Sequence, residues 1–352
     1  MGIKRYTATS DTTITNAYKM NLSDRGTDAN MGASDILDVF SIYGQASSTS
    51  TEKSRALLNF PVATIDSNRT DGDIPASGSV NFYLRLFNAK HSQTVPRNFT
   101  LTVSAVSTEW EEGVGLDMES YTDLGSANWV SASSGSGGAV TWATEGGDYF
   151  TDASSSFDVT FDTGVADLEV DITPLVEQWI SSSLQGEKAN YGIGVALTGS
   201  HETDTRSYYT KRFFARGSEF FFKRPVIEAR WNSATKDDRA NFYVSSSLAS
   251  PADNLNTLYF YNYVRGQLKN IPNIEQGQIY VKLYTSGANG EVLSPSGSGS
   301  FGVLENAVTG GYVSAGVYTA SFALDTSASI VYDRWFSGSG AGVLGDALHT
   351  SS

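Results

Sequence analysis

Short runs of alternating apolar and polar residues recur along most of this chain of 352 residues. In residues 79–87, for example, Val80, Phe82, Leu84 and Leu86 would share one side of an extended backbone. A period of two places one face of a strand in a core and the other face in water. Similar runs occupy 99–106, 157–170, 191–197, 257–264, 278–284, 316–324 and 330–336. The pattern therefore predicts an all-β protein.

One segment has the period of a helix instead. Four of its apolar side chains would form a single stripe: Leu175, Val176, Trp179 and Ile180. Thr173 can cap the helix, and Pro174 suits its first turn because proline needs no backbone hydrogen bond there. We expect a short helix over 174–183 that packs against a sheet and buries Trp179.

A polar, mixed-charge stretch, Asn232–Arg239, separates two sets of strand patterns. The chain is too long for one ordinary core, and such stretches join domains. We expect a jelly-roll-like β-sandwich with the one short helix over 1–232 and a linker over 233–239. About seven short strands in 240–340 are typical of a smaller Ig-like β-sandwich. The Gly-rich residues 341–352 are expected to form a flexible tail.

Several short motifs of the first domain occur in the order known from one family. They are Asn30-Met31-Gly32, Ile36 to Val39, Arg55 to Phe60, Trp110 to Gly113, Thr141-Trp142, Asp171 to Trp179, Asn190 to Ile193 and Arg224 to Ala229. Together they resemble the DNRLRE-type β-sandwich, a jelly-roll related to carbohydrate-binding modules. The resemblance implies that Trp110 is a core residue and that Glu111 and Glu112 are structural.

The whole chain also resembles virion structural proteins of large, particularly marine, tailed phages. The residues that carry this resemblance are Ile3 to Tyr6, Asp11 to Ala17 and Asn254 to Asn262. It implies a non-enzymatic protein that decorates a capsid, neck or tail through contacts with other virion proteins or with copies of itself. The alternative is a carbohydrate-binding adhesion module that recognises host-surface glycans.

Charge and composition exclude several other classes. The net charge is −14 and the isoelectric point is about 4.6, whereas proteins that read phosphate backbones carry a basic face. No apolar run reaches the roughly 18 residues of a membrane span. The chain has no cysteine, so it has no disulfide or thiolate chemistry. No apolar run follows the first residues, so we expect no signal peptide, synthesis in the host cytoplasm and a final location in the virion.

The motifs that could carry catalysis lack their usual context. The glycine pattern at 297–302 has no helix periodicity after it, so it indicates a loop and not a dinucleotide site. The three histidines belong to no metalloprotease or hydrolase motif. A glycosidase needs two carboxylates, and five are candidates: Glu109, Glu111, Glu112, Asp117 and Glu119. Solvated or structural acids are the favoured interpretation, so we expect no enzyme and no cofactor.

Calcium is the ion that the loops favour most. Asp24, Asp28, Asn30 and Asp35 lie close together in one loop, and Ca²⁺ prefers hard oxygen ligands. A structural calcium site is one interpretation of these residues, and ordinary solvated turn residues are the other.

The stretch 206–224 is basic and aromatic in a chain that is otherwise acidic. We consider eight of its residues as candidates for a subunit interface: Arg206, Tyr208, Tyr209, Lys211, Arg212, Arg216, Lys223 and Arg224. Interfaces enrich arginine and aromatic side chains, so an acidic neighbouring subunit could bind here. The alternative is a closing hairpin that turns at 216–218, with aromatics inward and arginines outward. Trp129 and Trp142 flank a Gly/Ser run and are glycan-binding candidates, or else core residues.

Overall fold

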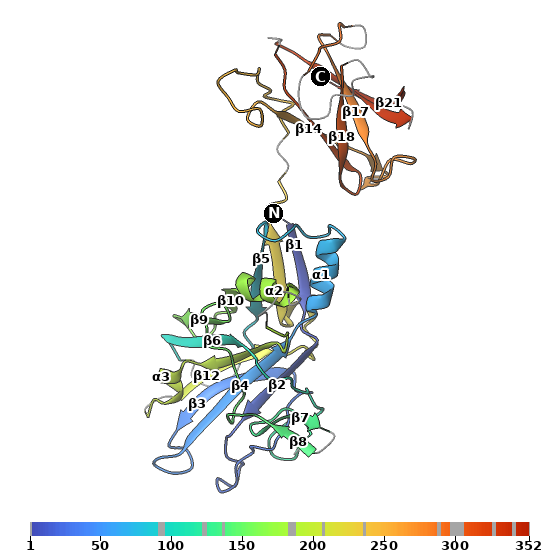
Figure 1. Cartoon of the computed structure of the whole chain (residues 1–352). Coiled ribbons are helices and arrows are strands. Elements are labelled where there is room, and N and C mark those ends of the chain that lie inside the picture. The colour runs from blue at the N-terminus through green and yellow to red at the C-terminus, as the bar shows by residue number, and fades with distance from the viewer. Residues whose placement is uncertain are drawn as a thin grey trace. The chain divides into compact units, whose positions relative to one another are not determined.

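The chain folds into two compact units, Met1–Ser233 and Ala234–Ser352. The computed structural model describes residues 2–90, 96–121, 125–135, 138–181, 188–205, 208–234, 237–286, 290–295, 306–325, 329–339 and 343–351. Antiparallel strands dominate both units, and the described helices are short (Figure 1). The prediction of an all-β, sandwich-like fold is confirmed.

Unit 1, Met1–Ser233, is built on two antiparallel sheets. One sheet has the order β1 (Gly2–Thr7), β13 (Val226–Trp231), β5 (Val80–Leu86) and β10 (Leu168–Asp171). The other has the order β12 (Tyr208–Phe214), β3 (Ile36–Tyr43), β4 (Thr51–Asn59), β11 (Ile193–Leu197), β6 (Phe99–Ala105) and β9 (Ser156–Phe161), with β2 (Ser10–Thr15) paired to β4. A separate ribbon pairs β7 (Ser131–Gly135) with β8 (Gly138–Thr141).

The main core of unit 1 takes side chains from both sheets. The four apolar residues of β5 alternate inward as expected, and Phe82, Leu84 and Leu86 are fully buried. They belong to the same cluster as Leu58 of β4 and Phe213 of β12, which come from the other sheet. Two sheets that share one apolar interior form a sandwich, and burial of this area is its main source of stability.

The described residues of unit 1 also form three short helices, α1 (Val62–Thr70), α2 (Thr173–Ile180) and α3 (Gly199–Glu202), and a 3₁₀ turn at Phe221–Lys223. Helix α2 corresponds to the predicted helix, and Trp179 is buried in the main core, as expected. The cap differs from the prediction. Asp171 accepts the Thr173 backbone N–H at 2.9 Å, while the Thr173 hydroxyl accepts the Phe82 N–H at 2.8 Å and fixes α2 to β5.

A second, tryptophan-rich cluster lies on the other side of β4. It contains Ile14, Leu57, Val106, Trp110, Ala127, Trp129, Ala132 and Trp142. Because successive residues of a strand point to opposite faces, β4 buries Leu58 in the main core and Leu57 in this cluster. The burial of Trp110 agrees with the prediction that it is a core residue.

In the described part of unit 2 one curled sheet encloses the core, where an Ig-like domain would use two separate sheets. The order is β14 (Asn256–Tyr261), β19 (Val317–Phe322), β18 (Ala307–Ser314), β17 (Ile279–Tyr284), β20 (Tyr332–Ser339) and β21 (Val343–Ser351). Strands β15 (Tyr263–Val264) and β16 (Gln267–Leu268) form a small hairpin. Trp335, Tyr318 and Val281 are buried at the centre of this core.

Two boundary predictions are corrected by the structure. Residues 343–351 were expected in a flexible tail, but they form β21, which pairs with β20 from Asp333↔Ser351 to Ser339↔Val343. Residues 237–239 were expected in the linker, but they are bonded within unit 2. Asp238 exchanges two hydrogen bonds with Thr257, and Arg239 forms an ion pair with Asp333 at 3.1 Å. In both cases partners within unit 2 order a segment that carries little apolar alternation of its own.

Candidate functional site

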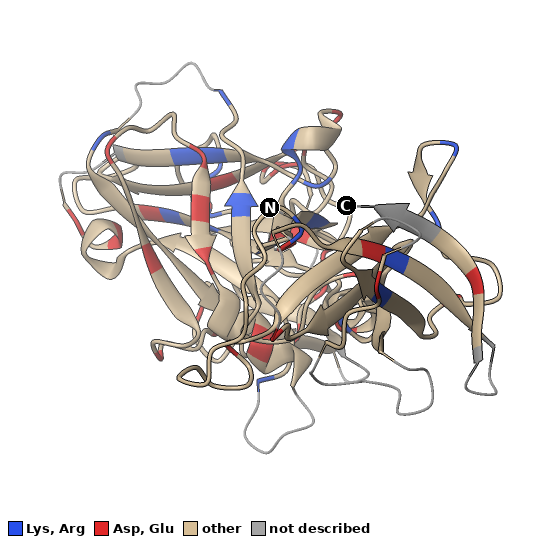
Figure 2. Cartoon of the chain, turned by 90° about the horizontal axis from the view of Figure 1, so that it is seen from above, with Lys and Arg blue, Asp and Glu red and all other residues tan. Residues whose placement is uncertain are grey.

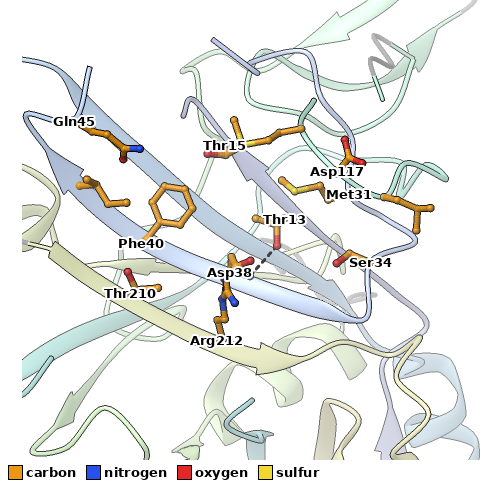
Figure 3. Close-up of a pocket in the computed structure, with 13 residues that line it drawn as sticks. Thr13, Thr15, Met31, Ser34, Asp38, Phe40, Gln45, Asp117, Thr210 and Arg212 are labelled. Carbon is orange, nitrogen blue, oxygen red and sulfur yellow. Dashed lines mark hydrogen bonds and ion pairs between the residues drawn. The ribbon is translucent and has the colours of Figure 1, made fainter. Parts of the chain in front are cut away.

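An open groove of about 730 Å³ lies on the outer face of the larger sheet of unit 1 (Figure 3). Its floor comes from β2, β3 and β12, and its walls come from the loops before β3 and around residue 117. The lining residues are Thr13, Thr15, Met31, Ser34, Asp38, Phe40, Ile42, Gln45, Leu116, Asp117, Met118, Thr210 and Arg212. In β3, Leu37 and Val39 face the core, so the alternation places Asp38 and Phe40 in the groove.

An ion pair stands in the floor of the groove. Arg212 lies opposite Asp38 in the β12–β3 register, and its Nε donates to Asp38 Oδ1 at 2.6 Å. Thr13 Oγ1 accepts the Asp38 backbone N–H at 3.0 Å (Figure 3). The side chains of Arg212 and Asp38 remain 40% and 27% exposed, so both can still contact a ligand. The groove thus combines an apolar ring, Phe40, with a charged donor and a charged acceptor.

Three consecutive phenylalanines form a second exposed feature, which we name the aromatic patch. Phe220, Phe221 and Phe222 are 51%, 62% and 78% exposed. The Lys223 ammonium lies over the Phe220 ring, 5.7 Å from its centroid, and the Arg224 guanidinium lies over Phe221 at 5.4 Å. The closing hairpin, one of the two interpretations of this stretch, placed its aromatics inward. The patch corrects that interpretation, because three successive rings cannot all reach one core.

The predicted hairpin is also wrong. Strand β12 pairs with β3 in the larger sheet, and β13 pairs with β1 and β5 in the smaller sheet. The segment from Ala215 to Pro225 therefore crosses from one sheet to the other. It carries the aromatic patch at the edge of the sandwich, where neither sheet covers it.

Most other interface candidates are occupied within the chain. Arg206 lies outside the described residues, and of Tyr208 only the backbone, at the start of β12, is described. Tyr209 is partly buried against the main core. Lys211 is 1% exposed, and its Nζ donates to Asn88 Oδ1 and to two backbone carbonyls. Basic and acidic residues lie side by side on several strands (Figure 2).

Arg216 belongs to a partly buried cluster with two carboxylates, in which Asp11 is fully buried. Its guanidinium makes two bonds of 2.6 and 2.5 Å to Glu112, and its backbone N–H donates to Asp11 at 2.6 Å. Burial raises the pKa of the Asp11 carboxyl to about 7. The negative charge of Glu112 raises this pKa further, whereas the hydrogen bond and the positive charge of Arg216 lower it. The cluster ties the start of β2 to the loop at Glu112 and to the segment that carries the aromatic patch.

The calcium candidates do not form a site in the described part of the chain. Asn30 is fully buried. Its Nδ2 donates to Glu112 O and Ala127 O, and its Oδ1 accepts from the backbone N–H groups of Gly32 and Gly115. Asp24 bonds to Asn21 instead. Among the described residues, no three acidic or histidine side chains gather as metal ligands would. Asn30 is therefore a structural residue that fixes the 112–115 loop.

The glycan candidates Trp129 and Trp142 are both only 5% exposed. Trp142 Nε1 donates to Asn128 O at 2.8 Å, and Arg55 lies over the Trp129 ring. Arg55 is itself fixed by two bonds to Glu202. Both tryptophans fill the second core, so they offer no exposed platform for a sugar.

The groove around Phe40 was not anticipated from the sequence. The one sequence feature that pointed to it was the alternation of β3, which places Asp38 and Phe40 on the same face of the strand.

Two acids of the candidate catalytic run have structural partners. Glu112 is neutralised by Arg216, and Glu111 accepts hydrogen bonds from the backbone and hydroxyl of Ser134.

Within the part of the chain that the structure describes, no helix is long and apolar enough to cross a bilayer. In comparisons with known proteins, no family model matches the chain and no curated protein is significantly similar. The fold and these surfaces define a two-unit β protein with an open groove and an exposed aromatic patch.

Proposed function

We propose that this chain is a non-enzymatic virion structural protein of a tailed phage, which decorates the capsid, neck or tail through subunit contacts. The observation that carries the proposal is the aromatic patch, Phe220–Phe222. Large apolar side chains that are exposed side by side mark surfaces that a partner covers. Aromatic residues flanked by Lys or Arg are also the composition of energetically important interface centres.

The polar chemistry of unit 1 supports binding over catalysis. Glu112, Glu202 and Glu228 are each paired with arginine side chains that hold the sheets and loops together. The resemblance of the opening residues to tailed-phage structural proteins supports the assignment to a virion. The likeness of the first domain to a DNRLRE-type sandwich fits a protein built for binding.

Incorporation into particles tests this proposal. Phage particles that carry Phe221→Ser and Phe222→Ser in this chain should contain less of it, because the contact loses two buried rings. Leu248→Ser is the matched control, since Leu248 is 96% exposed in unit 2. Quantitative mass spectrometry of purified particles measures the outcome. Absence of the parent chain from particles would overturn the proposal.

The groove favours a second candidate function, the binding of a host-surface glycan. Saccharides present apolar C–H faces and rings of hydroxyl groups. The Phe40 ring can stack against such a face, while Asp38 accepts from hydroxyls and Arg212 donates to them. The open shape of the groove suits a segment of a longer chain.

Calorimetric titration against a panel of oligosaccharides tests the second candidate. A binding glycan should lose at least about tenfold in affinity on Phe40→Ala, because the stacking surface is removed. Tyr263→Ala is the control, since Tyr263 is 61% exposed in unit 2 and far from the groove in sequence. Equal affinity of the Phe40→Ala variant and the parent would exclude the groove as the glycan site.

A further inference from the structure

The loop from Glu109 to Tyr121, which we name the acidic loop, exposes apolar and acidic side chains together. Val114, Leu116 and Tyr121 are 80%, 52% and 40% exposed. Among the described residues, no ion pair neutralises the four acids that flank them: Glu109, Glu111, Asp117 and Glu119. The acidic loop therefore has the composition of a docking segment, since it exposes apolar side chains among acidic ones.

The aromatic patch has the opposite charge. Lys223 and Arg224 form no ion pair within the described part of the chain, unlike Arg212, Arg216 and Arg230 of the same unit. Their cations lie over the rings of Phe220 and Phe221. One acid, Glu219, lies beside them. The patch is thus a net basic, aromatic surface in a chain of net charge −14.

One ion pair links the acidic loop to the patch segment within each molecule. Arg216, four residues before Phe220, makes its two bonds to Glu112, two residues before Val114. A protein whose complementary surfaces are linked in this way can pair with a copy of itself about a two-fold axis. Each patch then meets the other copy's loop, and the same contact forms twice.

We infer that the aromatic patch of one copy docks on the acidic loop of a second copy of this chain, so that the protein self-associates. The inference rests on the proposed assembly function and names the partner. The phenylalanines would bury against Val114, Leu116 and Tyr121, which accounts for most of the affinity. Lys223 and Arg224 would pair with acids such as Glu119, which aligns the two copies and makes the contact sensitive to salt.

Sedimentation velocity of the full chain over a range of concentrations tests the inference. We expect concentration-dependent dimers that weaken as the salt concentration rises. Phe221→Ser with Phe222→Ser should raise the dissociation constant at least about tenfold. Leu248→Ser should leave it unchanged, and unchanged circular dichroism would show that each variant is folded.

A charge exchange tests the pairing itself. Lys223→Glu and Glu119→Lys should each weaken self-association when alone, because both contacts of each homodimer then carry like charges. A mixture of the two variants should form a heterodimer in which one contact has its charges exchanged and the other is the parental contact, so that both contacts are complementary again. A parent chain that stays monomeric at low salt overturns the inference, as does a dimer that the phenylalanine substitutions leave intact. If the monomeric chain still needs Phe221 and Phe222 for incorporation into particles, the patch binds a different virion protein, and the proposed function stands without this inference.

Discussion

Lys211 is a cation held inside the sandwich of unit 1. Its Nζ donates to Asn88 Oδ1, Gly164 O and Ala166 O at 2.6 to 2.8 Å, and it lies over the rings of Phe161 and Phe213. Burial lowers the pKa of Lys211 to about 8, although the nearby Asp167 carboxylate opposes this shift. The residue fixes the 164–167 turn against β12. Burial of its charge lowers the free energy of unfolding by an amount that depends on pH.

The sign of that dependence follows from proton binding. Between pH 8 and the pKa of an unfolded lysine, near 10.4, the unfolded chain binds more protons at Lys211 than the folded chain does. The free energy of unfolding should therefore rise with pH in this window, by at most about 1.4 kcal/mol per pH unit. Lys211→Met should remove this rise and lower stability overall, because three buried acceptors lose their donor. Urea unfolding of both proteins at several pH values measures the effect, and parallel pH profiles would contradict it.

At the scale of elements, α2 shows how a short helix is held by its neighbours. Leu175, Val176 and Trp179 are buried in the main core, and Glu177 makes two bonds of 2.8 and 2.6 Å to Arg69 of α1. Helix α1 was not anticipated, because only Val62 and Ile65 of its nine residues are buried. An isolated helix this short would be unstable in water, so packing and the Arg69–Glu177 pair stabilise both helices.

Two substitutions of Trp179 separate its packing from its polar atom. Trp179→Ala should lower the free energy of unfolding by about 3–5 kcal/mol, because a large cavity remains in the core. Trp179→Phe should cost much less, since the indole Nε1 is buried without a hydrogen-bond partner in the described structure. Chemical denaturation compares the two variants. If Trp179→Ala is as stable as the parent, the side chain does not anchor α2.

At the scale of the whole molecule, the two units have separate cores. The cluster around Phe82 belongs wholly to unit 1, and the cluster around Trp335 belongs wholly to unit 2. Each β-strand pairing among the described residues joins strands of the same unit. A unit with its own apolar interior and its own sheets meets the structural requirement for independent folding.

The fragments 1–233 and 234–352 should therefore each fold alone. We expect fragment 1–233 to unfold cooperatively at the same denaturant concentration as unit 1 does in the full chain, followed by near-UV circular dichroism. Failure of fragment 1–233 to fold on its own would show that unit 2 contributes to its stability.

The local pattern of residues determined the class of fold and several buried positions. Alternation along β5 identified the inward faces of Phe82 and Leu84, and the apolar stripe of α2 identified Trp179, because burial depends directly on the period of the backbone. The extent of the curled sheet of unit 2 depended on more than this pattern. Strand β21 is ordered by hydrogen bonds to β20, and its sequence carries little apolar–polar alternation of its own.

Only the tertiary structure decided which of the notable side chains are available. Residue type made candidates of four side chains, Trp129, Trp142, Lys211 and Arg216. Each of them packs against or bonds to other residues of unit 1. Phe220–Phe222 were compatible with an inward hairpin face or with an interface, and they lie outside because the chain crosses between the two sheets at that point. Side-chain chemistry is fixed by the sequence, whereas exposure depends on strand pairing between residues far apart in the chain, and local periodicity does not encode that pairing.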